Sequence, residues 1–107
     1  MFANTDLSIR LPDGRRMGYA EYGDPAGKPV LHFHGTPDSR LEGTLPDVAE
    51  TAARLGVRLI LPDRPGIGLS DFQAGRAILD WPADVLALAD ALQLELFALM
   101  GLSGGGP

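Results

Sequence analysis

Residues 100–107 read Met-Gly-Leu-Ser-Gly-Gly-Gly-Pro, and this stretch guides the interpretation of the rest of the sequence. Residues 101–105 fit the pattern G-x-S-x-G, a sharp strand-to-helix turn that presents a serine at its tip. Such a turn holds the serine at a positive φ, which is costly for a residue with a Cβ. Gly101 and Gly105 leave room for the strand and the helix to pack around it. Ser103 is therefore a candidate nucleophile.

The apolar stretch before the motif strengthens this interpretation. Residues 96–102 are nearly all apolar and predict a strand that leads straight into the turn. The alternative is a glycine-rich turn that merely contains a serine. A continuously apolar strand is also typical of a central strand covered on both faces. We expect a helix to begin at Gly104, with its amides directed at any developing anion.

A serine in this position needs a histidine base and a carboxylate that orients the base. In folds with this turn, both partners follow the serine in the chain. Residues 104–107 contain neither a histidine nor a carboxylate. The sequence therefore predicts a nucleophile whose proton acceptor is not among these 107 residues.

Composition predicts one small domain and excludes several classes of function. The chain has 107 residues, of which 45% are apolar, and a net charge of −5. An acidic chain without clustered cations is not expected to bind nucleic acid or an anionic membrane. The chain has no cysteine, and residues 1–6 lack the features of a signal peptide, so we expect a cytoplasmic protein without a thiolate metal site.

The spacing of apolar residues and of Gly and Pro predicts an α/β fold. An antiparallel hairpin is expected to open the chain around Asp13-Gly14, a strong turn signal. Strands and helices then alternate in the order β-α-β-α-β, with parallel strands and right-handed crossovers. Thr44 and Asp80 are the expected N-caps of the two helices. The predicted strands are residues 6–11, 16–22, 29–34, 57–61 and 96–102, and the predicted helices are residues 45–55 and 81–93.

A second motif, His-Phe-His-Gly-Thr-Pro at residues 32–37, ends the first parallel strand. A loop at this position can donate a backbone N–H to an oxyanion, and the amides of Thr36 and Gly104 are the candidate pair. His32 and His34 lie on one strand face, so a metal pair or a general base is conceivable. We favour structural support of the loop through hydrogen bonds to the backbone, and we expect no metal.

Other polar and aromatic residues have mostly structural interpretations. Residues 63–71 form a Gly- and Pro-rich loop in which Asp and Ser side chains are expected to bind the backbone, although Asp63 at a strand end has a functional alternative. Asp84 and Asp90 are expected on a solvated helix face. Trp81 is expected in the core, with substrate contact as the alternative.

Taken together, residues 34–37 (His-Gly-Thr-Pro), 63–70 and 101–107 resemble the α/β-hydrolase fold superfamily. The resemblance implies that the strand before Ser103 is the fifth of eight and lies beside the third. It implies that residues 1–107 are the N-terminal part of a single core domain, which lacks the later strands and the cap. His34, Gly35, Gly101 and Gly105 would then support the site.

The resemblance also implies an activity. Serine at the turn is similar to the esterase, lipase and aminopeptidase branch, and Ser-Gly-Gly-Gly-Pro is found in proline-iminopeptidase-like members. We therefore expect a serine hydrolase that cleaves an ester, amide or similar acyl bond of a small molecule without a cofactor. The alternatives are a truncated, inactive fragment, which could associate through its open sheet edge, and a non-catalytic ligand-binding member.

Overall fold

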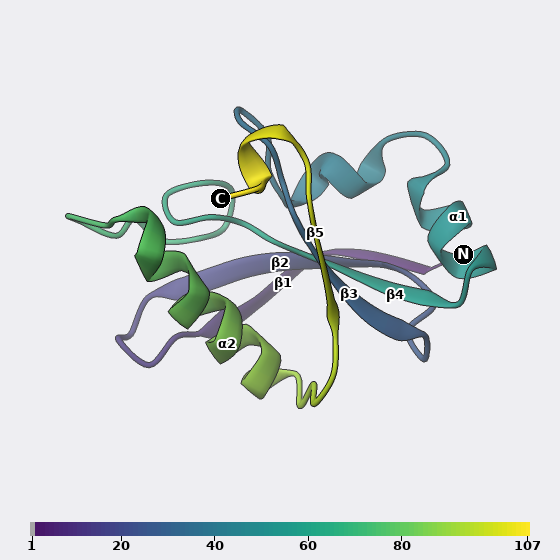
Figure 1. Cartoon of the computed structure of the whole chain (residues 1–107), viewed down its shortest axis with the longest axis horizontal. Coiled ribbons are helices and arrows are strands. Elements are labelled where there is room, and N and C mark those ends of the chain that lie inside the picture. The colour runs from purple at the N-terminus through teal and green to yellow at the C-terminus, as the bar shows by residue number, and fades with distance from the viewer. Residues whose placement is uncertain (1) are drawn as a thin grey trace.

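The computed structural model describes residues 2–107 and contains one mixed five-stranded sheet (Figure 1). The strands lie in the order β1-β2-β4-β3-β5, so β1 and β5 form the two edges. Two α-helices and two short 3₁₀ helices lie between the strands in the chain, and a third 3₁₀ helix follows β5. The strands are β1 (Phe2–Arg10), β2 (Arg16–Gly23), β3 (Lys28–Phe33), β4 (Val57–Pro62) and β5 (Ala98–Gly101). The helices are η1 (Arg40–Thr44), α1 (Val48–Arg54), η2 (Ile78–Asp80), α2 (Trp81–Ala91) and η3 (Ser103–Gly105).

The strand directions confirm the predicted α/β class. β1 and β2 form the antiparallel hairpin, and Gly14 in its turn has a φ of 94°, which glycine adopts without strain. β2 also pairs antiparallel with β4, whereas β3 runs parallel to both β4 and β5. The predicted neighbourhood of the third and fifth strands is thus confirmed.

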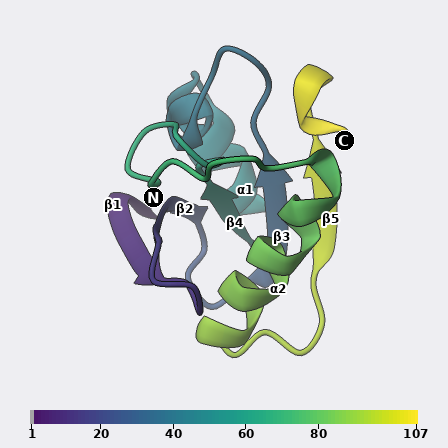
Figure 2. The ribbon, with the colours of Figure 1, turned by 90° about the vertical axis from the view of Figure 1, so that its left-hand side faces the viewer.

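Each face of the sheet packs against one α-helix (Figure 2). Alternation along β4 sends Ile60 to the α2 side and Leu59 and Leu61 to the α1 side. The α2 side holds the larger core, and Trp81 is buried in it as expected. The buried residues of this core are Leu11, Met17, Tyr19, Leu31, Ile60, Trp81, Val85 and Leu88.

Both predicted helices are shorter than expected at their ends. Thr44 does not cap α1, because it ends η1, where its Oγ1 donates to the Leu41 carbonyl at 2.6 Å. α1 begins only after Asp47, and Gly56, with a φ of 68°, follows its end as predicted. Asp80 makes no side-chain cap on α2, because its Oδ2 accepts from the Ala77 amide at 2.8 Å instead.

The expectation that Asp84 lies on a solvated face is wrong, whereas Asp90 is exposed as predicted. Asp84 is 6% exposed and receives both terminal nitrogens of Arg15, at 2.7 and 3.1 Å. Arg15 also donates to Asp13. These contacts raise the pKa of Arg15, with the Asp84 hydrogen bond as the main cause. The bidentate pair ties the hairpin turn to the first turn of α2.

The expectation that the strand before Ser103 is covered on both faces is also wrong for residues 2–107. β5 pairs with β3 alone and forms an edge of the sheet. Its apolar side chains are exposed, among them Leu99 at 60% and Met100 at 52%. The open apolar edge that was expected for a fragment is therefore present. None of the helices within residues 2–107 has the length and apolar character needed to cross a membrane.

Candidate active site

The turn after β5 (residues 101–105, called the elbow below) has the positive φ at Ser103 that the sequence predicts. Ser103 has a φ of 52°, is exposed, and is the first residue of the 3₁₀ helix η3, which follows β5 at the C-terminal end of the chain (Figure 1). A non-glycine residue in this left-handed region is strained and marks a site where the surrounding structure enforces the conformation. The expected helix is represented by η3, a single turn that begins at Ser103 itself.

The flanking glycines are required by close packing. A Cβ on Gly101 would lie 2.7 Å from the Gly105 carbonyl oxygen, so the two arms of the turn touch. A Cβ on Gly105 would collide with the carbonyl oxygen of Phe33 at the end of β3. The elbow is thus seated on the neighbouring strand through backbone atoms.

The loop after β3 lies directly against the elbow. Phe33 pairs with Gly101, so the carboxyl ends of β3 and β5 meet at one edge of the sheet. A Cβ built on Gly104 would lie 2.9 Å from Thr36 Oγ1 and 3.4 Å from the Thr36 amide nitrogen. A Cβ on Gly35 would lie 3.6 Å from that of Ser103. The structure therefore brings together the serine and the two amides that the sequence suggested.

His34 holds this loop through its ring nitrogens. The ring is 1% exposed, and its Nδ1 lies 2.9 Å from the Gly35 carbonyl oxygen, which can only accept. Its Nε2 accepts the Arg64 amide at 3.1 Å. These partners require the neutral Nδ1–H tautomer. His34 therefore bonds to backbone groups of two loops, the loop after β3 and the loop after β4.

The Gly35 carbonyl fixes the direction of the Thr36 amide. It accepts from His34 Nδ1 and also from the Asp38 amide at 2.9 Å. In a trans peptide unit the C=O and N–H point in opposite directions, so fixing the Gly35 carbonyl also orients the Thr36 N–H. Within residues 2–107 neither the Thr36 amide nor the Gly104 amide donates a hydrogen bond to another protein group. Both donors are free for a ligand.

Glu42 is a site residue that sequence reasoning missed. Its Oε1 lies 2.5 Å from His32 Nε2, and its Oε2 accepts the Gly35 amide at 3.0 Å. The Glu42 side chain is 5% exposed, so this link between strand β3 and the loop is buried. Nothing in the local pattern marks Glu42, because it lies on the 3₁₀ helix η1. His32 and His34 thus have separate partners, and residues 2–107 contain no cluster suited to a metal ion.

Asp63 organises the loop after β4, as the structural interpretation predicted. It is fully buried and accepts the amides of Arg40 and Leu69 at 2.7 and 2.9 Å. The Arg40 guanidinium lies 3.1 Å from its Oδ2. Ser70 Oγ donates to the Asp63 carbonyl at 2.7 Å. These contacts occupy the carboxylate within the scaffold.

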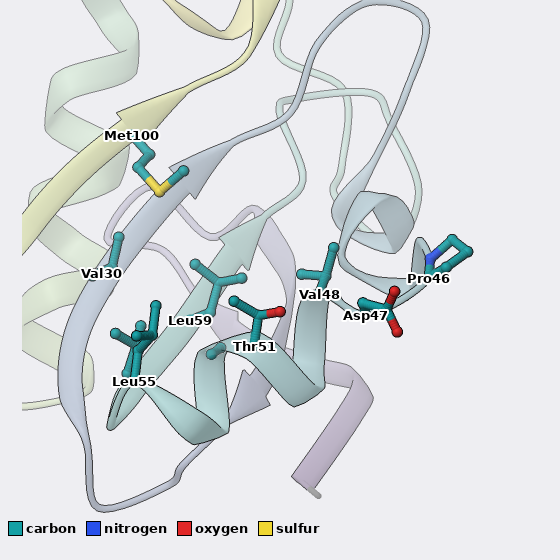
Figure 3. A pocket seen from close by; sticks show the side chains of 10 residues that line it. Val30, Pro46, Asp47, Val48, Thr51, Leu55, Leu59 and Met100 are labelled. Atoms are coloured by element: carbon teal, nitrogen blue, oxygen red, sulfur yellow. The ribbon is translucent and has the colours of Figure 1, made fainter.

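A pocket of about 390 Å³ lies away from the elbow, on the α1 face of the sheet (Figure 3). Val30 and Met100 line it from the strands, Val48 lines it from α1, and Leu55 lines it from the position just after α1. Its wall is apolar, and none of Ser103, Thr36 and Gly104 lines it. The pocket therefore contributes no reactive group to the candidate site.

Comparison with known proteins places this arrangement in a fold class. No protein-family profile matches the chain. It is 33% identical over 100 residues to the non-heme chloroperoxidase of Streptomyces lividans, covering 92% of this chain and 36% of that protein. It is 30% identical over 96 residues to the uncharacterised hydrolase YcgS of Bacillus subtilis, covering 89% and 32%.

Solved structures agree with these relatives. An esterase from Exiguobacterium antarcticum superposes with a TM-score of 0.78 at 26% identity, over 94% of this chain and 37% of that one. The epoxide hydrolase CorEH gives a TM-score of 0.83 at 26% identity, over 98% and 35%. The chain has the α/β-hydrolase fold. It corresponds to the N-terminal part of that fold and spans about a third of the length of the curated relatives that it matches.

Proposed function

We propose that the protein is a serine hydrolase that cleaves an ester, amide or similar acyl bond of a small molecule. Ser103 is the nucleophile, and the amides of Thr36 and Gly104 form the oxyanion hole. The observation that supports this best is a serine at positive φ beside two adjoining backbone amides that bind no other group of residues 2–107. Matched relatives and neighbours that are hydrolases and esterases agree with it.

In this mechanism Ser103 Oγ attacks the carbonyl carbon of the substrate while its proton passes to a base. The carbonyl oxygen becomes an oxyanion, which the two amides stabilise. When the bond to the leaving group breaks, that group takes the proton and an acyl-serine remains. Water then repeats the attack and frees the acid and Ser103.

We infer that the base that accepts the proton of Ser103 is not one of residues 2–107. His32 and His34 are the only histidines of this sequence, and their contacts are with Glu42, Gly35 and Arg64. Within the described residues no histidine or carboxylate hydrogen-bonds to Ser103. This observation favours a second candidate, in which the 107 residues alone are inactive and have an exposed β5 edge through which they associate with another chain.

Hydrolysis of a short p-nitrophenyl ester by the native protein tests the first proposal. We expect Ser103→Ala to lower kcat at least about 10³-fold, because the nucleophile is lost while the oxyanion hole remains. Ser8→Ala, on the exposed side of β1, is the matched control and should leave kcat unchanged. Equal turnover by Ser103→Ala and the wild type would remove Ser103 from the mechanism.

A fluorophosphonate probe separates the second candidate from the first. The native protein should be labelled at Ser103, whereas the isolated 107-residue chain should react at the rate of an ordinary serine. Rapid, specific labelling of the isolated chain at Ser103 would show that residues 1–107 already activate the serine. The absence of labelling in the native protein would favour a non-catalytic ligand-binding role.

A further inference from the structure

Arg64 is the residue that joins the two halves of the candidate site. It follows β4, and its backbone N–H donates to His34 Nε2 at 3.1 Å. Its side chain reaches back to the elbow, where Nη2 donates to the Gly105 carbonyl at 3.2 Å. One residue thus contacts both the histidine that holds the oxyanion loop and the last residue of the catalytic turn.

Two aromatic rings hold the Arg64 guanidinium in place. Its Cζ lies 4.9 Å from the centre of the Trp81 ring and 5.9 Å from the centre of the Phe33 ring. The two rings meet edge to face, with their centres 5.7 Å apart. Cations over aromatic faces are attracted by the ring quadrupole, and a flat guanidinium stacks there while it donates sideways. The core therefore directs the donor of Arg64 toward the elbow.

The position of Arg64 is electrostatically costly. Burial lowers the pKa of this guanidinium, and the neighbouring charge of Arg76 lowers it further. No carboxylate within residues 2–107 lies within ion-pair distance of it, whereas Arg15, Arg40 and Arg58 all have one. Its Nε is also buried without a partner among these residues. The side chain of Arg64 instead contacts the two aromatic rings and the Gly105 carbonyl of the elbow.

We propose that Arg64 is a positioning residue that fixes the Gly104 amide relative to the Thr36 amide. Its bond to Gly105 holds the elbow two peptide units beyond the one that carries the Gly104 N–H. Its bond to His34 holds the loop through the Gly35 carbonyl, which shares a peptide unit with the Thr36 N–H. This inference rests on the proposed function, because the two amides matter to turnover only if they bind an oxyanion.

The kinetic test compares Arg64→Met and Arg64→Lys with Arg58→Met in the native protein. Arg58 also extends from β4, at the far end from the elbow, and pairs with Glu21 at 2.6 and 2.9 Å. We expect Arg64→Met to lower kcat about 10- to 100-fold with KM within about twofold, since loss of a whole oxyanion donor costs about 10²–10³-fold. Arg64→Lys should recover less than half of the loss on a logarithmic scale. Arg58→Met should lower Tm but leave kcat unchanged.

A second measurement does not depend on activity. In the ¹⁵N-labelled native protein, Arg64→Met should shift the amide resonances of Thr36 and Gly104, whereas Arg58→Met should leave them in place. Shifts in these amides together with the loss of kcat support the inference. An unchanged kcat, or unshifted amides, in the folded Arg64→Met protein would overturn it.

The two proposals fail in different ways. Full turnover by Ser103→Ala would refute the proposed function. The amide resonances of Thr36 and Gly104 would still decide whether Arg64 positions the two peptide units. Should Arg64→Met not fold, Arg64→Lys decides, because it keeps the charge and the apolar stem. A kcat for Arg64→Lys equal to that of the wild type would then overturn the inference.

Discussion

Replacing Gly105 by alanine tests how closely the elbow is seated on β3. The new Cβ would collide with the Phe33 carbonyl oxygen and would lie 2.8 Å from Phe33 C and 2.9 Å from the His34 carbonyl oxygen. All three are backbone atoms, so no side-chain rotation relieves the overlap. Overpacking of this kind costs about 1–3 kcal/mol, and we expect Gly105→Ala to lower the free energy of unfolding by about 2–3 kcal/mol.

Urea unfolding followed by the fluorescence of Trp81, the one tryptophan of the sequence, measures this change. With a slope of about 1.5 kcal/mol per molar urea, the midpoint should fall by about 1.3–2 M. Gly106→Ala is the matched control, because its Cβ would lie 3.6 Å from the Ser103 carbonyl oxygen. Alanine suits the helical backbone at position 106 and restricts the unfolded chain, which is stabilising, but its Cβ is crowded by the ring of Pro107. The free energy of unfolding should therefore change by less than about 1 kcal/mol. Equal midpoints for the two variants would refute the close packing of the elbow on β3.

Two further predictions concern the scaffold. Asp84→Asn should lower the free energy of unfolding by about 2–3 kcal/mol. This is somewhat less than the usual cost of breaking a buried ion pair, because Arg15 still has Asp13 as an acidic partner. The control Asp90→Asn should change the free energy of unfolding by less than about 0.5 kcal/mol, and similar urea midpoints for both variants would contradict a stabilising role of the Arg15–Asp84 pair. Burial raises the pKa of Tyr19 and of Tyr22, the only tyrosines in the sequence. In the unfolded chain tyrosine ionises near pH 10. The buried, neutral tyrosines should therefore leave stability unchanged below about pH 10 and lower it as the pH rises above that value, where ionisation favours the unfolded chain. The tyrosinate absorbance should therefore appear together with the loss of the Trp81 signal, and reversible ionisation near pH 10 in a folded protein would disprove the shift.

Features that depend on neighbouring residues could be predicted from the sequence. Asp13-Gly14 marked the hairpin, Gly56 marked a helix end, and the motif around Ser103 indicated its positive φ. Each follows from the local conformational preferences of glycine or from the period of apolar residues.

Features that depend on distant partners could not be predicted. Asp84 is charged and lies on a helix, so its local pattern indicates solvent, whereas its burial depends on Arg15, 69 residues away. Glu42 and Arg64 contact the site through a 3₁₀ helix and a loop, which have no sequence period. The apolar sequence of β5 is typical of a covered strand, and its exposure depends on which segments lie beside it.

The pairing of β3 with β5 has a consequence for the order of folding. Val30 pairs with Ala98 across 68 residues of chain, whereas the β1–β2 hairpin closes over a short turn. Closing a long loop costs more conformational entropy, and contacts between distant residues slow folding. We therefore expect the hairpin and β4 to form early and the elbow to be added last. Because the serine and the oxyanion loop meet only through this late contact, a partly folded chain would contain both sequence motifs without an assembled site.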